Sequence, residues 1–92
     1  YEDDKMIVIR DVAPAAPVHV LMIPKAHTEN IITAEPELLL YMFGKVKELA
    51  EKLGVNEKGF RIVANTGDDG GQTVKHLHIH LLGGKALGWP PC

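Results

Sequence analysis

Apolar residues alternate with polar ones, or run together in short β-branched groups, along four stretches of the chain. The first stretch covers residues 6–12, and the second covers residues 18–23 and ends at Pro24. The third covers residues 59–65 and the fourth residues 76–82, with a glycine-rich loop between them. Short apolar runs bounded by proline and glycine are typical of strands. We expect four strands, of which the last two form an antiparallel pair because no helix separates them.

A different spacing, with apolar residues three and four positions apart, predicts one long helix between the second and third strands. We expect Thr33 to cap its start, Pro36 to lie in its first turn and Gly54 to end it in a left-handed conformation. Leu38 and Leu40 widen the apolar stripe beyond what packing on one sheet requires, which predicts that the helix also packs against a second subunit. The stripe itself consists of Leu39, Met42, Phe43, Val46, Leu49, Ala50 and Leu53.

These elements predict the α+β class, with a small antiparallel sheet and one long helix on a face. The length suits a single domain that covers residues 1–92. Apolar residues make up 46% and charged residues 24%, as in an ordinary globular chain rather than a disordered one. The net charge is −2 and the lysines and arginines are thinly spread, so neither nucleic acid nor a membrane surface is favoured as a partner.

Features that report on the cellular compartment are few. No apolar run approaches the roughly 20 residues that cross a bilayer, and no signal peptide is recognisable. The only cysteine is the last residue, Cys92, which cannot form a disulfide within the chain. A reducing compartment fits this composition. We therefore expect a cytoplasmic protein, which in a eukaryote could also enter the nucleus.

The fourth predicted strand carries the clearest chemistry. Because side chains on a strand alternate between two faces, His76, His78 and His80 share one face and the aliphatic residues between them share the other. A neutral imidazole can act as a nucleophile when an acceptor holds the N–H of its other nitrogen. We expect His78, in the middle of the row, to be the nucleophile, and its two neighbours to position oxyanions or relay protons.

The glycine-rich loop before this strand supplies hydrogen-bond donors. Gly70-Gly71-Gln72-Thr73 offers unhindered backbone N–H groups, a side-chain amide and a hydroxyl, which suit the charge that develops in phosphoryl or acyl transfer. Asn65, at the end of the third predicted strand, faces the same loop. Three in-phase histidines beside such a loop predict a catalytic site for group transfer.

Other interpretations of the histidines stay open at this point. Two histidines at positions i and i+2 of a strand can bind one zinc ion, although no cysteine lies near and no carboxylate adjoins the strand. Asp68 and Asp69 lie in the loop, where they favour the turn. His19 is interpreted as a packed or exposed residue of the second strand. His27 follows a strand exit, where a structural and a functional role are equally compatible with the sequence.

The alternation of histidine and apolar residues from 76 to 82 resembles the motif of the histidine triad (HIT) superfamily and matches it at every position. Within that superfamily the chain is most similar to the Hint branch of nucleotide-binding proteins. Residues 65–74, the pair Gly83-Gly84 and the ending Trp89-Pro90-Pro91 carry this likeness. Stretches nearer the N-terminus also fit, namely Tyr1-Glu2-Asp3-Asp4, Asp11-Val12-Ala13-Pro14, Ala16-Pro17-Val18-His19 and Ile23-Pro24-Lys25-Ala26-His27.

The resemblance implies a fold, an assembly and a reaction. Each subunit would have an antiparallel sheet of about five strands, and a homodimer would join two sheets into one ten-stranded sheet with the long helices packed together. The ligands would be purine nucleoside monophosphates, and the reaction would be hydrolysis of nucleoside phosphoramidates such as adenosine 5′-phosphoramidate, without a metal or other cofactor. Relatives carry a further N-terminal segment with a helix near the base, so the chain is N-terminally short relative to the family.

The same resemblance implies roles for individual residues. His78 would become nucleotidylated, and a backbone carbonyl on its own strand near His80 would hold its other ring nitrogen. His76 and His80 would line the phosphate site, His27 would complete the cluster beside His76, and Asp11 would hold the ribose hydroxyls. Further contacts would come from Ile9 and Val12 at the base, from Asn65, Gly71, Gln72 and Thr73 around the phosphate, and from Trp89, which would approach the partner subunit's site.

Two positions depart from the pattern that is usual in this branch. Thr73 stands where serine is common, and it keeps the hydroxyl. Ile9 replaces an aromatic residue, which should weaken stacking on the base. We expect an enzyme that hydrolyses P–N bonds through a nucleotidyl-histidine. The alternatives are a nucleotide-binding adaptor with little catalysis and a zinc-binding protein.

Overall fold

Four strands form one antiparallel sheet in the computed structural model, which describes residues 1–91 and leaves Cys92 outside the described residues. The α+β class and the antiparallel pairing agree with the prediction, although the described residues form four strands where the resemblance implies about five. The spatial order is β1-β2-β4-β3, so the histidine strand is paired on both sides. The strands are β1 (Met6–Arg10), β2 (Val18–Pro24), β3 (Phe60–Val63) and β4 (Ile79–Gly83).

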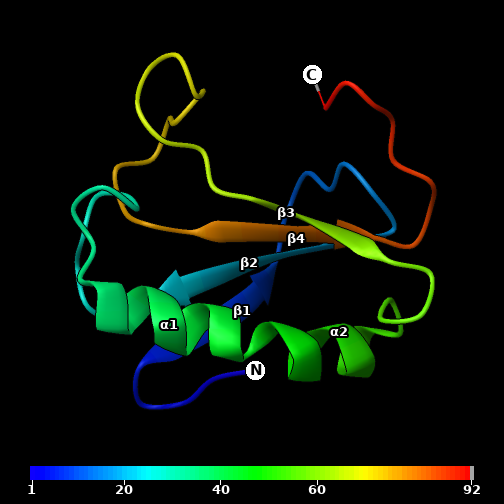
Figure 1. Cartoon of the computed structure of the whole chain (residues 1–92), viewed down its shortest axis with the longest axis horizontal. Coiled ribbons are helices and arrows are strands. Elements are labelled where there is room, and N and C mark those ends of the chain that lie inside the picture. The colour runs from blue at the N-terminus through cyan, green and yellow to red at the C-terminus, as the bar shows by residue number, and fades with distance from the viewer. Residues whose placement is uncertain (92) are drawn as a thin grey trace.

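Two consecutive helices, α1 (Pro36–Gly44) and α2 (Val46–Leu53), lie on one side of the sheet (Figure 1). They form the one long helix expected, with a bend at Lys45, because the N–H of Lys45 bonds to a carbonyl three residues earlier and tightens the turn there. Proline occupies the first turn of α1, and Gly54 ends α2 with a φ of 74°, as predicted. Within the described residues, no helix has both the length and the apolar character needed to cross a membrane.

The helix start differs from the prediction. Thr33 does not cap α1, because Glu35 occupies the cap position and makes no side-chain hydrogen bond there. The Thr33 hydroxyl instead accepts the N–H groups of Glu29 and Asn30 and bonds to the hydroxyl of Thr28 at 2.7 Å. Thr33 therefore closes the turn before α1, which follows His27.

β1 ends at Arg10 rather than at residue 12. The N–H of Asp11 donates to the carbonyl of His19, and the Asp11 carboxylate accepts the N–H of Ala13, which starts a turn. β3 is also shorter than predicted at both ends, because Gly59 takes a left-handed φ of 105° and Asn65 belongs to the following loop.

β4 begins at Ile79 rather than at residue 76. Pro24 ends β2 and has no N–H with which to extend the ladder between the two strands. The N–H of Leu77 donates to the carbonyl of Thr28 instead, at 2.7 Å. The segment nevertheless keeps its alternation, because Leu77, Ile79 and Leu81 are buried while the three histidines are half-buried.

The core lies between the sheet and the two helices. Residues opposite one another on neighbouring strands share a face, so Leu81 packs with its partners Val20 on β2 and Ile62 on β3 toward α2. The opposite face carries the histidines and is not covered by a helix among the described residues (Figure 1). The large side chains with the deepest burial are Met6, Met22, Pro24, Met42, Leu77, Ile79 and Leu81.

A matched pair of valines tests this division between core and surface. Val20 is 4% exposed, and Val20→Ala should lower the free energy of unfolding by about 2 kcal/mol, because two methyl groups lose their packing. Val12 is fully exposed, and Val12→Ala should change it by less than about 0.5 kcal/mol. Urea unfolding followed by circular dichroism, at one protein concentration, measures both. Equal effects of the two substitutions would contradict the assigned core.

Candidate active site

The uncovered face of the sheet brings histidines together from two adjacent strands. Leu21 lies opposite His80, and His19 lies opposite Leu82, so all four side chains are on this face. His78 precedes β4 on the same side, with its ring centroid 5.1 Å from that of His80. The connection between β1 and β2 and the loop before β4 also rise on this side of the sheet (Figure 1).

His78 has the arrangement of a nucleophile. Its Nδ1–H donates to the carbonyl oxygen of His76 at 2.9 Å. Because a carbonyl oxygen only accepts, the neutral ring carries its proton on Nδ1 and a lone pair on Nε2. Within residues 1–91 no group forms a hydrogen bond to that Nε2, so it is available to attack. The holding carbonyl was expected near His80, and it belongs to His76 on the other side of the nucleophile.

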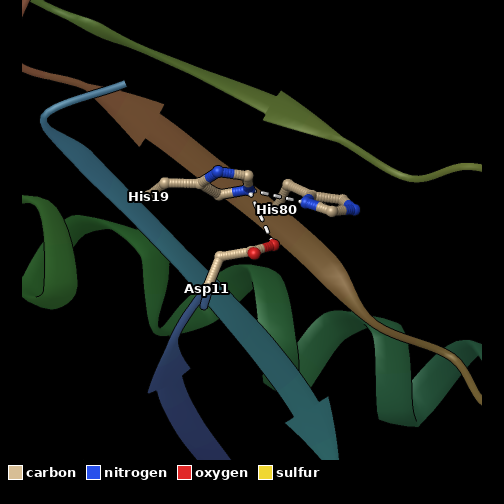
Figure 2. Close-up of side chains that lie close together, drawn as sticks. All are labelled: Asp11, His19 and His80. Atoms are coloured by element: carbon tan, nitrogen blue, oxygen red, sulfur yellow. Dashed lines mark hydrogen bonds and ion pairs between the residues drawn. The ribbon is translucent and has the colours of Figure 1, made fainter. Parts of the chain in front are cut away.

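His80 is held by His19, a residue for which the sequence suggested only a place in the strand. The N–H of Ala15 donates to Nδ1 of His19 at 3.0 Å, so the neutral His19 ring carries its proton on Nε2. That Nε2 lies 2.9 Å from Nδ1 of His80 and donates to it (Figure 2). His80 must then carry its own proton on Nε2, at the side of the ring away from His19 (Figure 2). A hydrogen-bond donor therefore faces the site beside His78.

The charge state of His80 supports the same role. Burial lowers the pKa of His80 from its ordinary value of 6.5, and positive charge on His78 or His19 lowers it further. The carboxylate of Asp11 acts in the opposite direction and is the weakest of these influences. The neutral ring is thus favoured near neutral pH, and the neutral ring is the form that accepts from His19 on one nitrogen and donates from the other.

His76 uses both ring nitrogens inside the protein. Its Nε2–H donates to the carbonyl of Pro24 at 2.9 Å, which leaves the lone pair of the neutral ring on Nδ1. The Nδ1–H of His27 donates to that lone pair at 3.1 Å. The structure therefore brings His27 beside His76, as the resemblance implies. The same bonds leave His76 without a ring nitrogen for a phosphate.

Asn65 and Gly70 shape the loop before β4. The side-chain amide of Asn65 donates to the carbonyl of Gly70 at 2.7 Å. A Cβ atom at residue 70 would lie 2.3 Å from the carbonyl oxygen of Thr66, which only glycine avoids. Gly71 follows with a left-handed φ of 76°. Gly70 is required by the close approach of two backbone segments, and Gly71 is favoured by its left-handed conformation.

Gln72 joins this loop to the turn before α1. Its side-chain oxygen accepts from the N–H of Gly67 at 3.0 Å and from the amide of Asn30 at 3.2 Å. Its side-chain nitrogen donates to the carbonyls of Glu29, at 2.7 Å, and of Val74, at 3.1 Å. These four hydrogen bonds engage both polar atoms of the Gln72 side chain within the protein. Among the described residues the Gln72 side chain therefore ties this loop to the turn before α1, and its expected contact with a phosphate stays a prediction.

Two backbone donors remain available near His78. Gly71 and Gln72 donate their N–H groups to carbonyls within the loop. In residues 1–91 the N–H groups of Thr73 and Val74 have no such acceptor, and the Thr73 side chain is exposed. An anion beside the nucleophile could bind these two amides. Space for a bound group exists there, in an apolar cavity of about 130 Å³ lined by Leu21, Ile23, Val74, His76 and His78.

The residues expected at the nucleoside lie at the end of β1. Asp11 is half-buried, with Oδ2 3.5 Å from Nε2 of His19 and Oδ1 bonded to an N–H two residues further on. Ile9 is 43% exposed and Val12 fully exposed, so both are accessible to a ligand. Trp89, on the tail after β4, is 83% exposed.

Asp11, His19 and His80 together have the composition of a metal site, with one ligand atom of each within 4.8 Å of the others. A cation could bind Nε2 of a neutral His19 only if the ring proton moved to Nδ1. The N–H of Ala15 already donates to Nδ1, so two donors would then face each other. The hydrogen bonding at these residues therefore favours proton sharing between the two rings over metal binding.

A larger cavity, of about 750 Å³, lies beyond the end of β4. We place the site at the histidines because this cavity holds no histidine and no carboxylate, and size alone supplies no chemistry. Its lining consists of Gly54, Val55, Lys58, Gly59, Gly84, Lys85 and Ala86.

Known proteins resemble the chain in both sequence and structure. The family model described as HIT domain matches residues 1–87. An uncharacterized HIT-like protein of Synechococcus elongatus is 55% identical over 94 residues, which cover 99% of this chain and 82% of that relative. A HIT family hydrolase from Legionella pneumophila superposes with a TM-score of 0.95 at 42% identity, over 100% of this chain and 85% of that one. A HIT family hydrolase from Clostridium thermocellum gives 0.89 at 47% identity, over 96% and 79%.

The environment of His80 leads us to predict a lowered pKa for its ring. The ring should titrate below pH 6.5, because burial and the neighbouring histidines oppose its protonation. Since the folded protein binds this proton less readily than the unfolded chain, His80 should also reduce stability as the pH falls below 6.5. NMR of the ring C–H signals against pH measures the midpoint. His78→Ala should raise it by removing one neighbouring charge, and a midpoint at or above 6.5 in the unsubstituted protein would contradict the assignment.

Proposed function

The chain belongs to the HIT domain family, and on this basis we propose that it is a hydrolase that cleaves the P–N bond of purine nucleoside phosphoramidates, of the adenosine 5′-phosphoramidate type. The reaction proceeds through a covalent nucleotidyl-histidine on His78. One observation carries the proposal: Nδ1 of His78 is bonded to a carbonyl, so the lone pair of Nε2 faces the site beside the N–H of His80. Proteins similar to the chain that are named HIT family hydrolases support the hydrolytic class.

The first step is an attack of Nε2 of His78 on the phosphorus. A P–N bond to His78 forms, the P–N bond to the amine breaks, and the amine leaves with a proton from solvent. The N–H of His80 and the backbone N–H groups of Thr73 and Val74 stabilise the charge on the phosphoryl oxygens as it develops.

The second step is hydrolysis of the intermediate. Water attacks the phosphorus, the bond to His78 breaks, the nucleoside monophosphate leaves, and a proton returns to solvent. Asp11 holds the ribose hydroxyls, while Ile9 and Val12 contact the base. No step needs a metal ion, and the proton positions on His19 and His80 support this.

Turnover of adenosine 5′-phosphoramidate tests the role of His78. His78→Ala should lower the rate by at least about a thousandfold, because no other group replaces the nucleophile. Mass spectrometry of protein quenched during turnover should find a nucleotidyl adduct on His78. In His78→Gly, added imidazole should restore part of the rate by entering the space that the side chain leaves.

Equal rates in the unsubstituted protein and His78→Ala would remove His78 as the nucleophile. Tight binding of nucleoside monophosphates without turnover or adduct would favour the nucleotide-binding adaptor instead.

We also propose a homodimer in which the helices of two subunits pack together. Two apolar side chains of α1 point outward, since Leu40 is 75% and Phe43 47% exposed. Phe43 lines a cavity of about 490 Å³ together with Val46 and Phe60. β3 lies at the edge of the sheet, where its unpaired backbone groups can join the sheet of a second copy. In such a pair, Trp89 would reach the site of the partner.

The molar mass in solution tests the dimer. Phe43→Asp should shift the protein to a monomer at micromolar concentration, because the interface would have to bury an unpaired carboxylate. Light scattering after size-exclusion chromatography measures this, and Val12→Asp is the matched control, on an exposed apolar residue away from the helices. A monomeric mass for the unsubstituted protein would refute the proposal.

A further inference from the structure

We propose that His27 is a positioning residue, which fixes the tautomer of His76 and thereby holds the carbonyl that orients the nucleophile His78. The proposal rests on the proposed function and deepens it. The ring of His27 is exposed, and it is linked to His78 only through His76.

The backbone favours one of the two tautomers of His76. The carbonyl of Pro24 can only accept a hydrogen bond, so Nε2 of His76, 2.9 Å away, must carry a proton. In the neutral ring, Nδ1 then has a lone pair. Without a donor on that side, the ring could move its proton to Nδ1, and the bond to Pro24 would be lost.

His27 supplies the donor that prevents this. Its Nδ1 lies 3.1 Å from Nδ1 of His76, and only one of the two atoms can carry the shared proton. Because Nδ1 of the neutral His76 ring has the lone pair, His27 must donate. The ring of His76 is thereby held at both nitrogens, by Pro24 on one side and by His27 on the other.

The same turn also holds the peptide group that faces the nucleophile. The carbonyl of His76 and the N–H of Leu77 belong to one peptide group. That N–H donates to the carbonyl of Thr28, the residue after His27, at 2.7 Å. The carbonyl accepts Nδ1–H of His78 at 2.9 Å. Ring and peptide of His76 are therefore both fixed by neighbouring residues of one turn.

A loss of the His27 donor would act on the nucleophile in two steps. A freely rotating His76 ring would loosen the peptide that follows it, and the carbonyl would no longer fix Nδ1–H of His78. The lone pair on Nε2 of His78 would then point at the phosphorus for a smaller share of the time. Misplacement of a reacting group by about 1 Å can lower a rate about a hundredfold.

Three variants of His27 separate hydrogen-bond donation from other roles. Asparagine places an amide N–H close to the position of Nδ1, glutamine places it near Nε2, and alanine removes the donor. We expect His27→Ala to lower kcat by about ten- to a hundredfold with KM changed by less than about twofold, because binding of the nucleoside is unaffected. His27→Asn should recover most of this loss, and His27→Gln should not.

A second measurement needs no substrate. Long-range ¹H–¹⁵N spectra of the imidazole rings in the unliganded protein should show His76 with its proton on Nε2 and His78 with its proton on Nδ1. In His27→Ala the His76 ring should become a mixture of both tautomers, while thermal unfolding shows the variant to be folded. If the unsubstituted protein hydrolyses no phosphoramidate, the proposed function fails and these spectra alone decide the role of His27.

Several results would overturn the proposal. Unchanged tautomers of His76 in His27→Ala would do so, as would equal kcat values for the alanine variant and the unsubstituted protein. Loss in KM alone, or equal activity of the asparagine and glutamine variants, would show that donation at the Nδ1 position is not what His27 contributes.

Discussion

The hydrogen bond from Nδ1 of His78 to the carbonyl of His76 is the interaction on which the site depends. A histidine can attack only from a nitrogen without a proton, and this bond decides which nitrogen that is. Backbone groups act in the same way on the neighbouring rings: the N–H of Ala15 on His19, and the carbonyl of Pro24, together with His27, on His76. Because peptide groups do not change their donor or acceptor character, the proton positions follow from the course of the chain.

The path of the backbone near the site depends on where the pairing between β2 and β4 ends. Pro24 has no N–H with which to continue the ladder between β2 and β4, so the three residues before β4 leave the sheet pairing, with a bend at His76. Their polar groups then bond to the turn before α1 and to one another. A ladder that continued past Pro24 would have paired it with Leu77, whose N–H bonds to Thr28 instead. The carbonyl of His76 accepts from the ring of His78.

Much of this could be predicted from the sequence, because it depends on local patterns. Alternation along residues 76–82 placed the histidines and the core residues on opposite faces, and Gly54 ended the helix as expected. The contact between His19 and His80 could not be predicted, since it requires knowing that β2 and β4 are neighbours. Thr33 was wrongly expected to cap the helix for a related reason: its hydroxyl suits a cap, but nearby backbone N–H groups bond to it instead.

The two faces of the segment 77–81, which ends in β4, have different functions on consecutive residues. Leu77, Ile79 and Leu81 hold the helices, while His78 and His80 face the opposite side. Substitutions can therefore alter the reacting face and leave the packing face untouched. Changes in length cannot, because the insertion or deletion of a single residue here would exchange the two sets of side chains between the faces. We therefore expect this segment to accept side-chain substitutions during evolution but not insertions or deletions, which would change its register.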